Sequence, residues 1–169
     1  ELPIMSDNYE IVNSFETTRY QKISEMITKV SFYGKAVNTL SGDDVRISKR
    51  LFIPGSKLRG FESGKIGPIE NNDFIGGNYV SAANFTATLP QLLPSFQNMD
   101  FSFFIDAANV WGVDYDSSID DNSKIRSTTG LNIDVLTPVG PLSFSFSQPI
   151  TKSSSDITES FRFNLGTTF

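Results

Sequence analysis

The sequence predicts an all-β protein, and within that class a transmembrane antiparallel β-barrel, on three observations. Apolar and polar residues alternate along most of the chain, as in Leu142-Ser143-Phe144-Ser145-Phe146-Ser147, and a period of two is that of a strand with unlike faces. The 169 residues include 15 Phe, yet many small polar residues keep the mean hydropathy at −0.16. The alternating segments span roughly 10–16 residues, and a tilted strand needs about 9–11 residues to cross a bilayer.

In chain order, the alternation predicts seven strands, preceded by the stub of an earlier strand at 1–4. The seven strands are expected at residues 9–20, 25–40, 76–89, 97–111, 124–137, 141–150 and 157–169. The links at 21–24, 90–96 and 138–140 are short, that at 151–156 is intermediate, and those at 41–75 and 112–123 are long and polar. Short turns on one side and long loops on the other are typical of outer-membrane barrels, where they are periplasmic and extracellular respectively.

A soluble β-sandwich is the alternative, because it also combines alternation with frequent turns. Three features favour the membrane barrel. The predicted strands are long, whereas strands of soluble proteins usually have about 5–6 residues. The polar face consists mostly of Ser, Thr and Asn, which suits a hydrated interior, and the apolar alternation continues to Phe169, where a soluble chain usually frays.

The composition excludes several chemistries. The chain has no Cys and no His, so disulfides, thiolate nucleophiles, sulfur-based zinc sites and histidine-based catalytic triads are impossible. We therefore predict no enzyme activity, no catalytic residue, no metal and no cofactor. The net charge of −5 argues against a nucleic-acid partner, which needs a basic surface. The chain opens on Glu1 rather than Met, which favours an internal or processed fragment.

Four acidic residues crowd the predicted link at 112–123, and they are Asp114, Asp116, Asp120 and Asp121. Clustered carboxylates are the ligands that Ca²⁺ prefers, but no EF-hand spacing accompanies them. The simpler interpretation is a solvated surface loop. Bridging to lipopolysaccharide through divalent cations is the alternative.

The longest link contains the motif Leu58-Arg59-Gly60-Phe61 among several glycines. An isolated Arg-Gly-Phe is often only a turn, but further motifs follow it. They are Gly76-Gly77-Asn78, Phe104-Ile105-Asp106-Ala107-Ala108-Asn109-Val110-Trp111, Thr129-Gly130-Leu131, Thr137-Pro138-Val139-Gly140-Pro141-Leu142 and Phe146-Ser147-Gln148-Pro149. In this order and spacing, over about residues 25–169, they resemble the BamA family, the outer-membrane protein assembly factors of the bacterial surface antigen family. Ala108 departs from the glycine of the family pattern.

The resemblance implies a 16-stranded barrel preceded by periplasmic POTRA domains, in the outer membrane of a Gram-negative bacterium. Residues 1–169 would form the C-terminal part of that barrel, about 7–8 strands, with 41–75 folded back into the lumen. The POTRA domains and the first strands would be absent from this chain. The implied function is to fold and insert unfolded outer-membrane proteins. The implied partners are those substrates, outer-membrane lipids and lipopolysaccharide, and accessory lipoproteins that bind the POTRA domains.

The resemblance also indicates a partner for Arg59 on the inner wall of the barrel. Asp106 lies on the polar face by alternation and matches the family's inner-wall aspartate. Arg binds a carboxylate through two parallel hydrogen bonds, so we predict a bidentate clamp between loop and wall. Some family members carry a second acid where this chain has Thr86, so two alternatives stay open: the clamp has a single acid here, or Glu62 or Asp134 substitutes for the second one. The alternative is a solvated loop arginine, whose ion pairs contribute about 0–1 kcal/mol.

The predicted last strand resembles the C-terminal targeting signal of outer-membrane proteins. Its apolar face carries Phe161, Phe163, Leu165 and the terminal Phe169. Gly166 weakens a strand and permits a bend, so we predict a seam that opens easily, although a glycine needed only for packing is the alternative. An open seam exposes unpaired backbone groups to which a substrate strand can add.

Two other functions stay open at this stage. A translocator of two-partner secretion or of the TamA type has the same barrel with a different cargo, and a passive pore is the third possibility. A part of a barrel also has two edges, so this chain could close alone, pair with another copy or belong to a longer chain.

Overall fold

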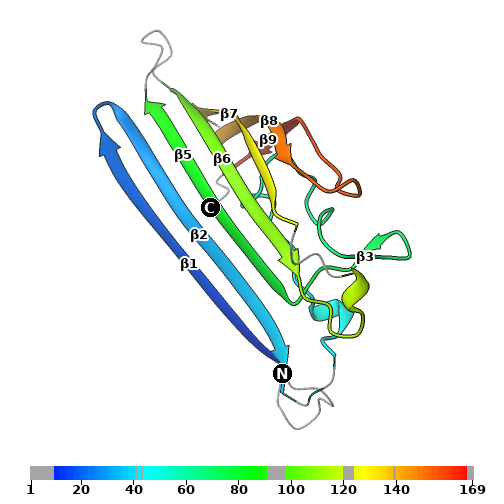
Figure 1. Cartoon of the computed structure of the whole chain (residues 1–169). Coiled ribbons are helices and arrows are strands. Elements are labelled where there is room, and N and C mark those ends of the chain that lie inside the picture. Colours follow the sequence, from blue (N-terminus) through cyan, green and yellow to red (C-terminus); the bar gives the residue numbers. More distant parts are fainter. Residues whose placement is uncertain are drawn as a thin grey trace.

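The structure, a computed structural model, describes residues 10–40, 42, 44–90, 98–119, 124–138 and 140–166. Its main element is a seven-stranded antiparallel sheet in which each strand pairs with the next strand of the sheet along the chain (Figure 1). The strands are β1 (Glu10–Ile23), β2 (Met26–Thr39), β5 (Tyr79–Pro90), β6 (Met99–Trp111), β7 (Arg126–Thr137), β8 (Gly140–Thr151) and β9 (Phe161–Leu165). Smaller elements are η1 (Ile47–Lys49), the hairpin of β3 (Ile69–Glu70) and β4 (Asp73–Phe74), and η2 (Ser117–Ile119).

Six of the seven predicted strands end within three residues of the observed bounds. The seventh was predicted too long at its beginning, because residues 157–159 pair with the long link rather than with the sheet. The stub at 1–4, together with Phe169, Asp120 and Asp121, lies outside the described residues. No helix in the described part of the chain is long and apolar enough to span a membrane.

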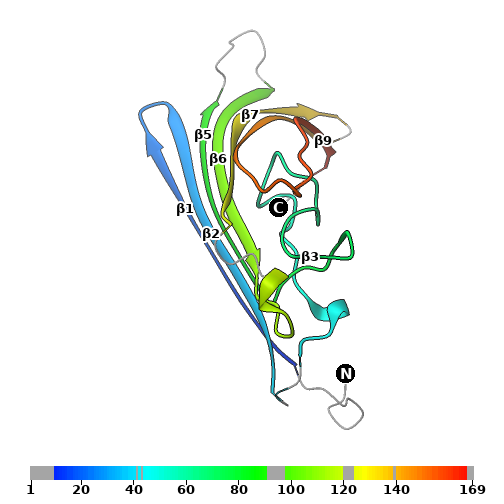
Figure 2. The same cartoon turned by 45° about the vertical axis from the view of Figure 1, so that its right-hand side comes forward.

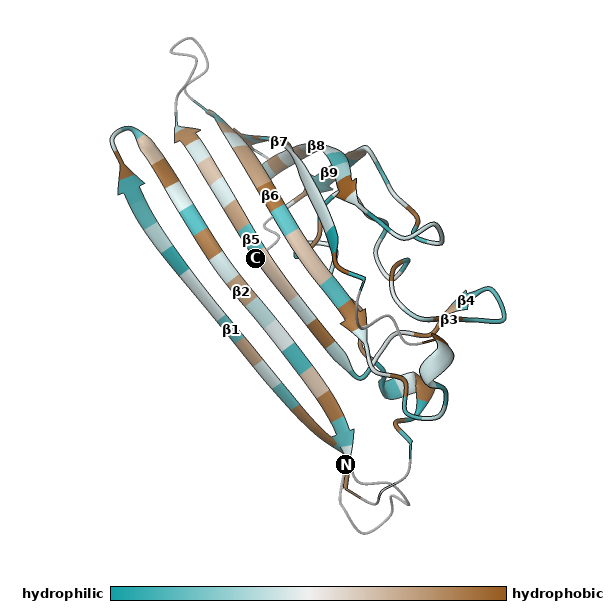
Figure 3. Ribbon diagram, viewed as in Figure 1, coloured by the Kyte–Doolittle hydropathy of each residue, from teal (hydrophilic) through white to brown (hydrophobic). Residues whose placement is uncertain are grey.

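The sheet buries its polar face and exposes its apolar face, which is the reverse of a soluble sandwich. Ser145 and Ser147 on β8 are 3% and 8% exposed, whereas Phe146 between them is 48% exposed. The Phe rings pack against one another on the outside, with centroids 5.2 Å apart for Phe146 and Phe161. Figure 3 shows this alternation as bands of opposite hydropathy along the strands. An apolar outer surface around a polar interior is the pattern of a transmembrane barrel, so the soluble alternative is wrong.

The long link between β2 and β5 lies against the concave face of the sheet, which curves around it (Figure 2). We call residues 44–78 the inner loop and the face that they cover the inner face. Apolar side chains of the loop pack against apolar side chains of the wall to form the core. The loop contributes Val45, Leu51, Ile53, Leu58, Phe61 and Ile66, and the wall contributes Val37, Val80, Ala82, Ala108 and Val110. The apolar core therefore holds the loop inside the sheet.

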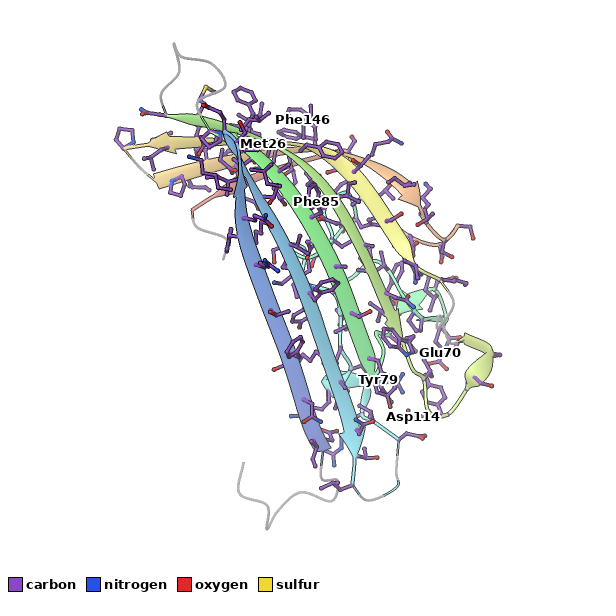
Figure 4. All side chains as sticks on the ribbon, turned by 60° about the vertical axis from the view of Figure 1, so that its left-hand side comes forward. Met26, Glu70, Tyr79, Phe85, Asp114 and Phe146 are labelled. Atoms are coloured by element: carbon purple, nitrogen blue, oxygen red, sulfur yellow. The ribbon has the colours of Figure 1, made fainter. Side chains whose placement is uncertain are left out.

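Polar contacts join the long links at one end of the sheet. Figure 4 places Glu70, Tyr79 and Asp114 toward that end, and Met26 and Phe146 toward the opposite one. The Asp114 carboxylate accepts hydrogen bonds from the backbone N–H of Val45, at 2.9 Å, and from the side chain of Asn78. The Tyr115 hydroxyl donates to Glu70 at 2.8 Å, which raises the pKa of Tyr115 above its usual value. Asp114 therefore serves the packing of the loops.

Candidate functional site on the inner face

Two apolar side chains anchor the Leu58-Arg59-Gly60-Phe61 motif. Leu58 and Phe61 are 1% and 2% exposed, and burying each stabilises the docked loop by about 1.5–3 kcal/mol. Gly60 between them has a φ of +85°, and an added Cβ would lie 2.6 Å from Thr128 Oγ1 and 2.9 Å from Ser147 Cβ. Only glycine combines this conformation with so close an approach to the wall.

Arg59 and Asp106 form a bidentate ion pair between the inner loop and β6. Arg59 Nε donates to Asp106 Oδ2 and Nη2 donates to Oδ1, both at 2.7 Å. The backbone N–H of Arg59 adds a third bond to Oδ2 at 3.1 Å, and Asn84 Nδ2 donates to Oδ1 at 2.9 Å. Four donors therefore compensate a carboxylate that is fully buried. Removing one partner of such a pair typically costs about 3–5 kcal/mol.

The guanidinium of Arg59 has two further contacts. It lies 3.6 Å from the centroid of the Phe104 ring, in the cation–π geometry. Its Nη2 also donates to Thr86 Oγ1 at 3.3 Å, at the position where the resemblance led us to expect a second acid. Asp134, one of the two candidate replacements, instead accepts from Asn132 Nδ2 and from the Ser143 hydroxyl. For Glu62, the other candidate, the contact found is one of the backbone: its N–H donates to Ile157 O.

A second set of contacts joins the motif to the end of the chain. Backbone bonds run from Glu62 N–H to Ile157 O at 2.9 Å, from Ile157 N–H to Lys65 O at 3.1 Å and from Glu159 N–H to Gly60 O at 3.1 Å. Arg162 on β9 donates from Nη1 to Gly55 O at 2.6 Å and from Nη2 to Phe61 O at 2.7 Å. The sequence analysis missed Arg162, although it is a lone charge between two outward phenylalanines.

A buried ion pair that the sequence analysis also missed joins β7 to the link between β8 and β9. Arg126 and Asp156 have fully buried side chains, and Arg126 Nη2 lies 2.9 Å from Asp156 Oδ1. Arg126 Nε also donates to Asp156 Oδ2 at 3.0 Å, and Nη1 donates to Asn109 Oδ1 at 3.0 Å. The pair holds residues 152–160 over the inner face, where they meet the loop.

A polar cavity of about 700 Å³ lies beside the motif on the inner face. Its lining combines both signs of charge, from Lys29, Lys57, Arg59, Glu62, Asp134, Glu159 and Arg162, with uncharged polar side chains between them. Such a lining favours water over an apolar ligand. Within the described ranges, no three Asp or Glu side chains come together as a metal site.

The terminal strand presents its predicted apolar face outward. Phe161, Phe163 and Leu165 are 50%, 51% and 63% exposed. Gly166 has a φ of +99°, and an added Cβ would meet nothing within 4 Å. Among the described residues, close packing therefore does not require this glycine, whereas its backbone conformation does. Its N–H donates to Pro141 O at 2.9 Å, which is the last described bond of the strand.

The fold and the site define a class of protein: part of a transmembrane β-barrel with an Arg-Gly-aromatic loop docked on its inner wall. Residues 6–169 match the model of the Omp85 superfamily domain. The chain belongs to this superfamily, a group of β-barrel proteins of the Gram-negative outer membrane, and the predicted resemblance and location are thereby confirmed.

Individual relatives agree with this assignment. An alignment of 141 positions, which covers 66% of this chain, gives 30% identity to the outer membrane protein assembly factor BamA of Neisseria meningitidis serogroup B. An alignment of 132 positions, which covers 76% of this chain, gives 26% identity to BamA of Neorickettsia risticii. The crystal structure of BamA from Haemophilus ducreyi lacking POTRA domains 1–3 superposes with a TM-score of 0.78 at 26% identity, covering 92% of this chain and 34% of that one. The chain spans only 17% and 18% of the two curated relatives.

Proposed function

We propose that the protein containing this chain folds and inserts β-barrel proteins into the outer membrane. The observation that carries the proposal is the inner loop held to β6 by Arg59 and Asp106 and bound, at its other side, to the segment that leads into β9. The relatives of this chain bear the name of outer-membrane protein assembly factors, which supports the same function. An ion-selective conductance that does not change when the loop is mutated would instead support a passive pore.

The proposed mechanism is strand templating at the last strand. Among the described residues, β9 pairs with β8 from Phe146 opposite Phe161 to Leu142 opposite Leu165, and no described strand pairs with the other edge of β9. In hydrocarbon an unpaired backbone N–H or C=O costs several kcal/mol, so an edge that opens there binds any strand that satisfies it. A substrate strand would exchange onto this edge and pass on into its own barrel. Such catalysis breaks no covalent bond and needs no catalytic side chain or cofactor.

The proposed partners follow from the surfaces. Unfolded outer-membrane proteins would bind the edge, and lipid chains would contact the outward phenylalanines of β8 and β9. The long links would face lipopolysaccharide, and POTRA domains upstream of this chain would bind accessory lipoproteins. The alternative is a related translocator of two-partner secretion or of the TamA type. Such a protein would have the same barrel and would differ from an assembly factor in its cargo.

A reversible disulfide tests the proposal in the full-length protein. These 169 residues hold no native Cys, so Asn164→Cys on the inner face of β9 can be paired with one cysteine in the first barrel strand. We expect the oxidised protein to stop inserting substrate barrels into vesicles and the reduced protein to recover. Full insertion by the oxidised protein would refute strand exchange at this edge. Export of a soluble cargo without any insertion would instead identify a translocator.

A further inference from the structure

We infer that Arg162 is a positioning residue that couples the docking of the inner loop to the pairing of the terminal strand. Its guanidinium holds two carbonyl oxygens of the loop, Gly55 O and Phe61 O, one on either side of Arg59 in the sequence. Its Nε pairs with Glu159, just before β9. Each of the three guanidinium nitrogens of Arg162 therefore has a partner. Two of these partners belong to the part of the inner loop that carries the motif.

The segment before β9 depends on the loop for its hydrogen bonds. Residues 157–159 exchange backbone bonds with residues 60–65, and Phe61 forms a β-bridge with Thr158. The sheet itself bonds this end of the strand through Ser147 N–H and Ser160 O. If the loop leaves, the N–H groups of Ile157 and Glu159 and the C=O of Ile157 lose these partners, so fewer hydrogen bonds hold the segment that leads into β9. The release of the loop and the loosening of β9 should thus occur together.

The loop consequently bridges two strands that are not paired with each other in the sheet. Arg59 binds it to β6, Arg162 binds it to β9, and β7 and β8 lie between these strands in the sheet. If the two attachments are coupled, the Arg59 attachment stabilises the Arg162 attachment by the same coupling free energy as the Arg162 attachment stabilises the Arg59 attachment, since linkage is reciprocal. This reciprocity distinguishes coupling from two independent contacts.

Gly55 supplies an independent probe of the Arg162 contact. A Cβ added at Gly55 would lie 2.8 Å from Arg162 Nη1 and 3.4 Å from its Cζ. Alanine at this position should therefore push the guanidinium away without removing its charge. Gly34 is the matched control, because a Cβ added there meets nothing within 4 Å.

This inference deepens the proposed function and rests on it for one consequence: that a docked loop keeps β9 paired and a released loop frees β9 for a substrate strand.

The coupling is measured separately from assembly, by hydrogen exchange on the purified full-length protein in lipid nanodiscs. Arg162→Ala should accelerate exchange about tenfold or more in both 55–65 and 157–162, because it removes charge-assisted hydrogen bonds. Arg59→Ala should accelerate 157–162, and Arg19→Ala, at an exposed position of β1, should change neither segment.

Gly55→Ala should reproduce the effect of Arg162→Ala and add nothing to it in the double variant, while Gly34→Ala has no effect. The inference is overturned if Arg162→Ala accelerates β9 alone, or if Arg59→Ala leaves 157–162 unchanged. If Arg162→Ala fails to fold, Arg162→Lys and Gly55→Ala carry the same test. Coupled exchange with unchanged substrate insertion would overturn the consequence for assembly. A wild-type protein that inserts no substrate would refute the proposed function and leave the coupling intact.

Discussion

The Asp106 carboxylate, fully buried in β6, accepts hydrogen bonds from both Nε and Nη2 of Arg59, each at 2.7 Å. The planar guanidinium matches the two oxygens in distance and direction, and an ammonium group does not. We expect Arg59→Lys to release the loop nearly as much as Arg59→Ala, with each lost charge-assisted hydrogen bond costing about 1.5–3 kcal/mol.

Trypsin cleavage after Lys57 and Lys65, loop sites that both variants keep, and substrate insertion by the full-length protein measure this effect, with Arg19→Lys on β1 as the control. A lysine variant with a protected loop and normal insertion would contradict the bidentate clamp.

Arg126 and Asp156 make a different prediction, because both side chains are fully buried. Removing either partner leaves an uncompensated buried charge, so Arg126→Met or Asp156→Leu alone should lower the free energy of unfolding by about 3–5 kcal/mol. The double variant should be less destabilised than the sum of the two, because it leaves neither charge behind. Urea unfolding in detergent micelles measures all three. Additive losses would show that the two groups do not depend on each other.

Gly60→Ala should displace the motif from the wall. The new methyl group would meet Thr128 Oγ1 at 2.6 Å, and the φ of +85° disfavours any residue with a Cβ. We expect a loss of loop docking comparable to that of Arg59→Ala, seen as faster trypsin cleavage at Lys57 and Lys65. Gly60→Ala combined with Thr128→Ala should recover part of the docking, since it removes the nearest atom. No recovery would assign the defect to the backbone conformation and to the contact with Ser147 Cβ at 2.9 Å.

Gly166→Ala tests the conformation at the end of β9. Nothing lies within 4 Å of the added Cβ, so any effect must come from the φ of +99°. We expect the N–H bond of residue 166 to Pro141 O to weaken, and hydrogen exchange at that amide to rise severalfold. Unchanged exchange would show that alanine adopts this conformation without cost.

The alternation of side chains made most of the sheet predictable. A one-residue slip in register would turn Phe144 and Phe146 inward, so the alternation determines which residues face the interior. The same alternation placed Asp106 on the inner face, and the motif around Arg59 indicated it as the partner of that arginine. The roles of Arg162 and Arg126 were not predictable. Their partners, Gly55, Phe61 and Asp156, lie in irregular segments. Such segments have no alternating pattern from which the direction of a side chain, and hence a long-range contact, can be inferred. The beginning of β9 was missed for the same reason.

The measurement that tests the account most directly is the environment of adjacent residues on β8. Spin labels attached to Phe146→Cys and, separately, to Ser145→Cys of the full-length protein in lipid bilayers report collisions with oxygen and with a water-soluble nickel chelate. We predict oxygen-dominated collisions at 146, whose side chain is 48% exposed on the outer face, and nickel-dominated or shielded behaviour at 145, which is 3% exposed on the inner face. A water-exposed label at 146 beside a lipid-exposed label at 145 would contradict the account.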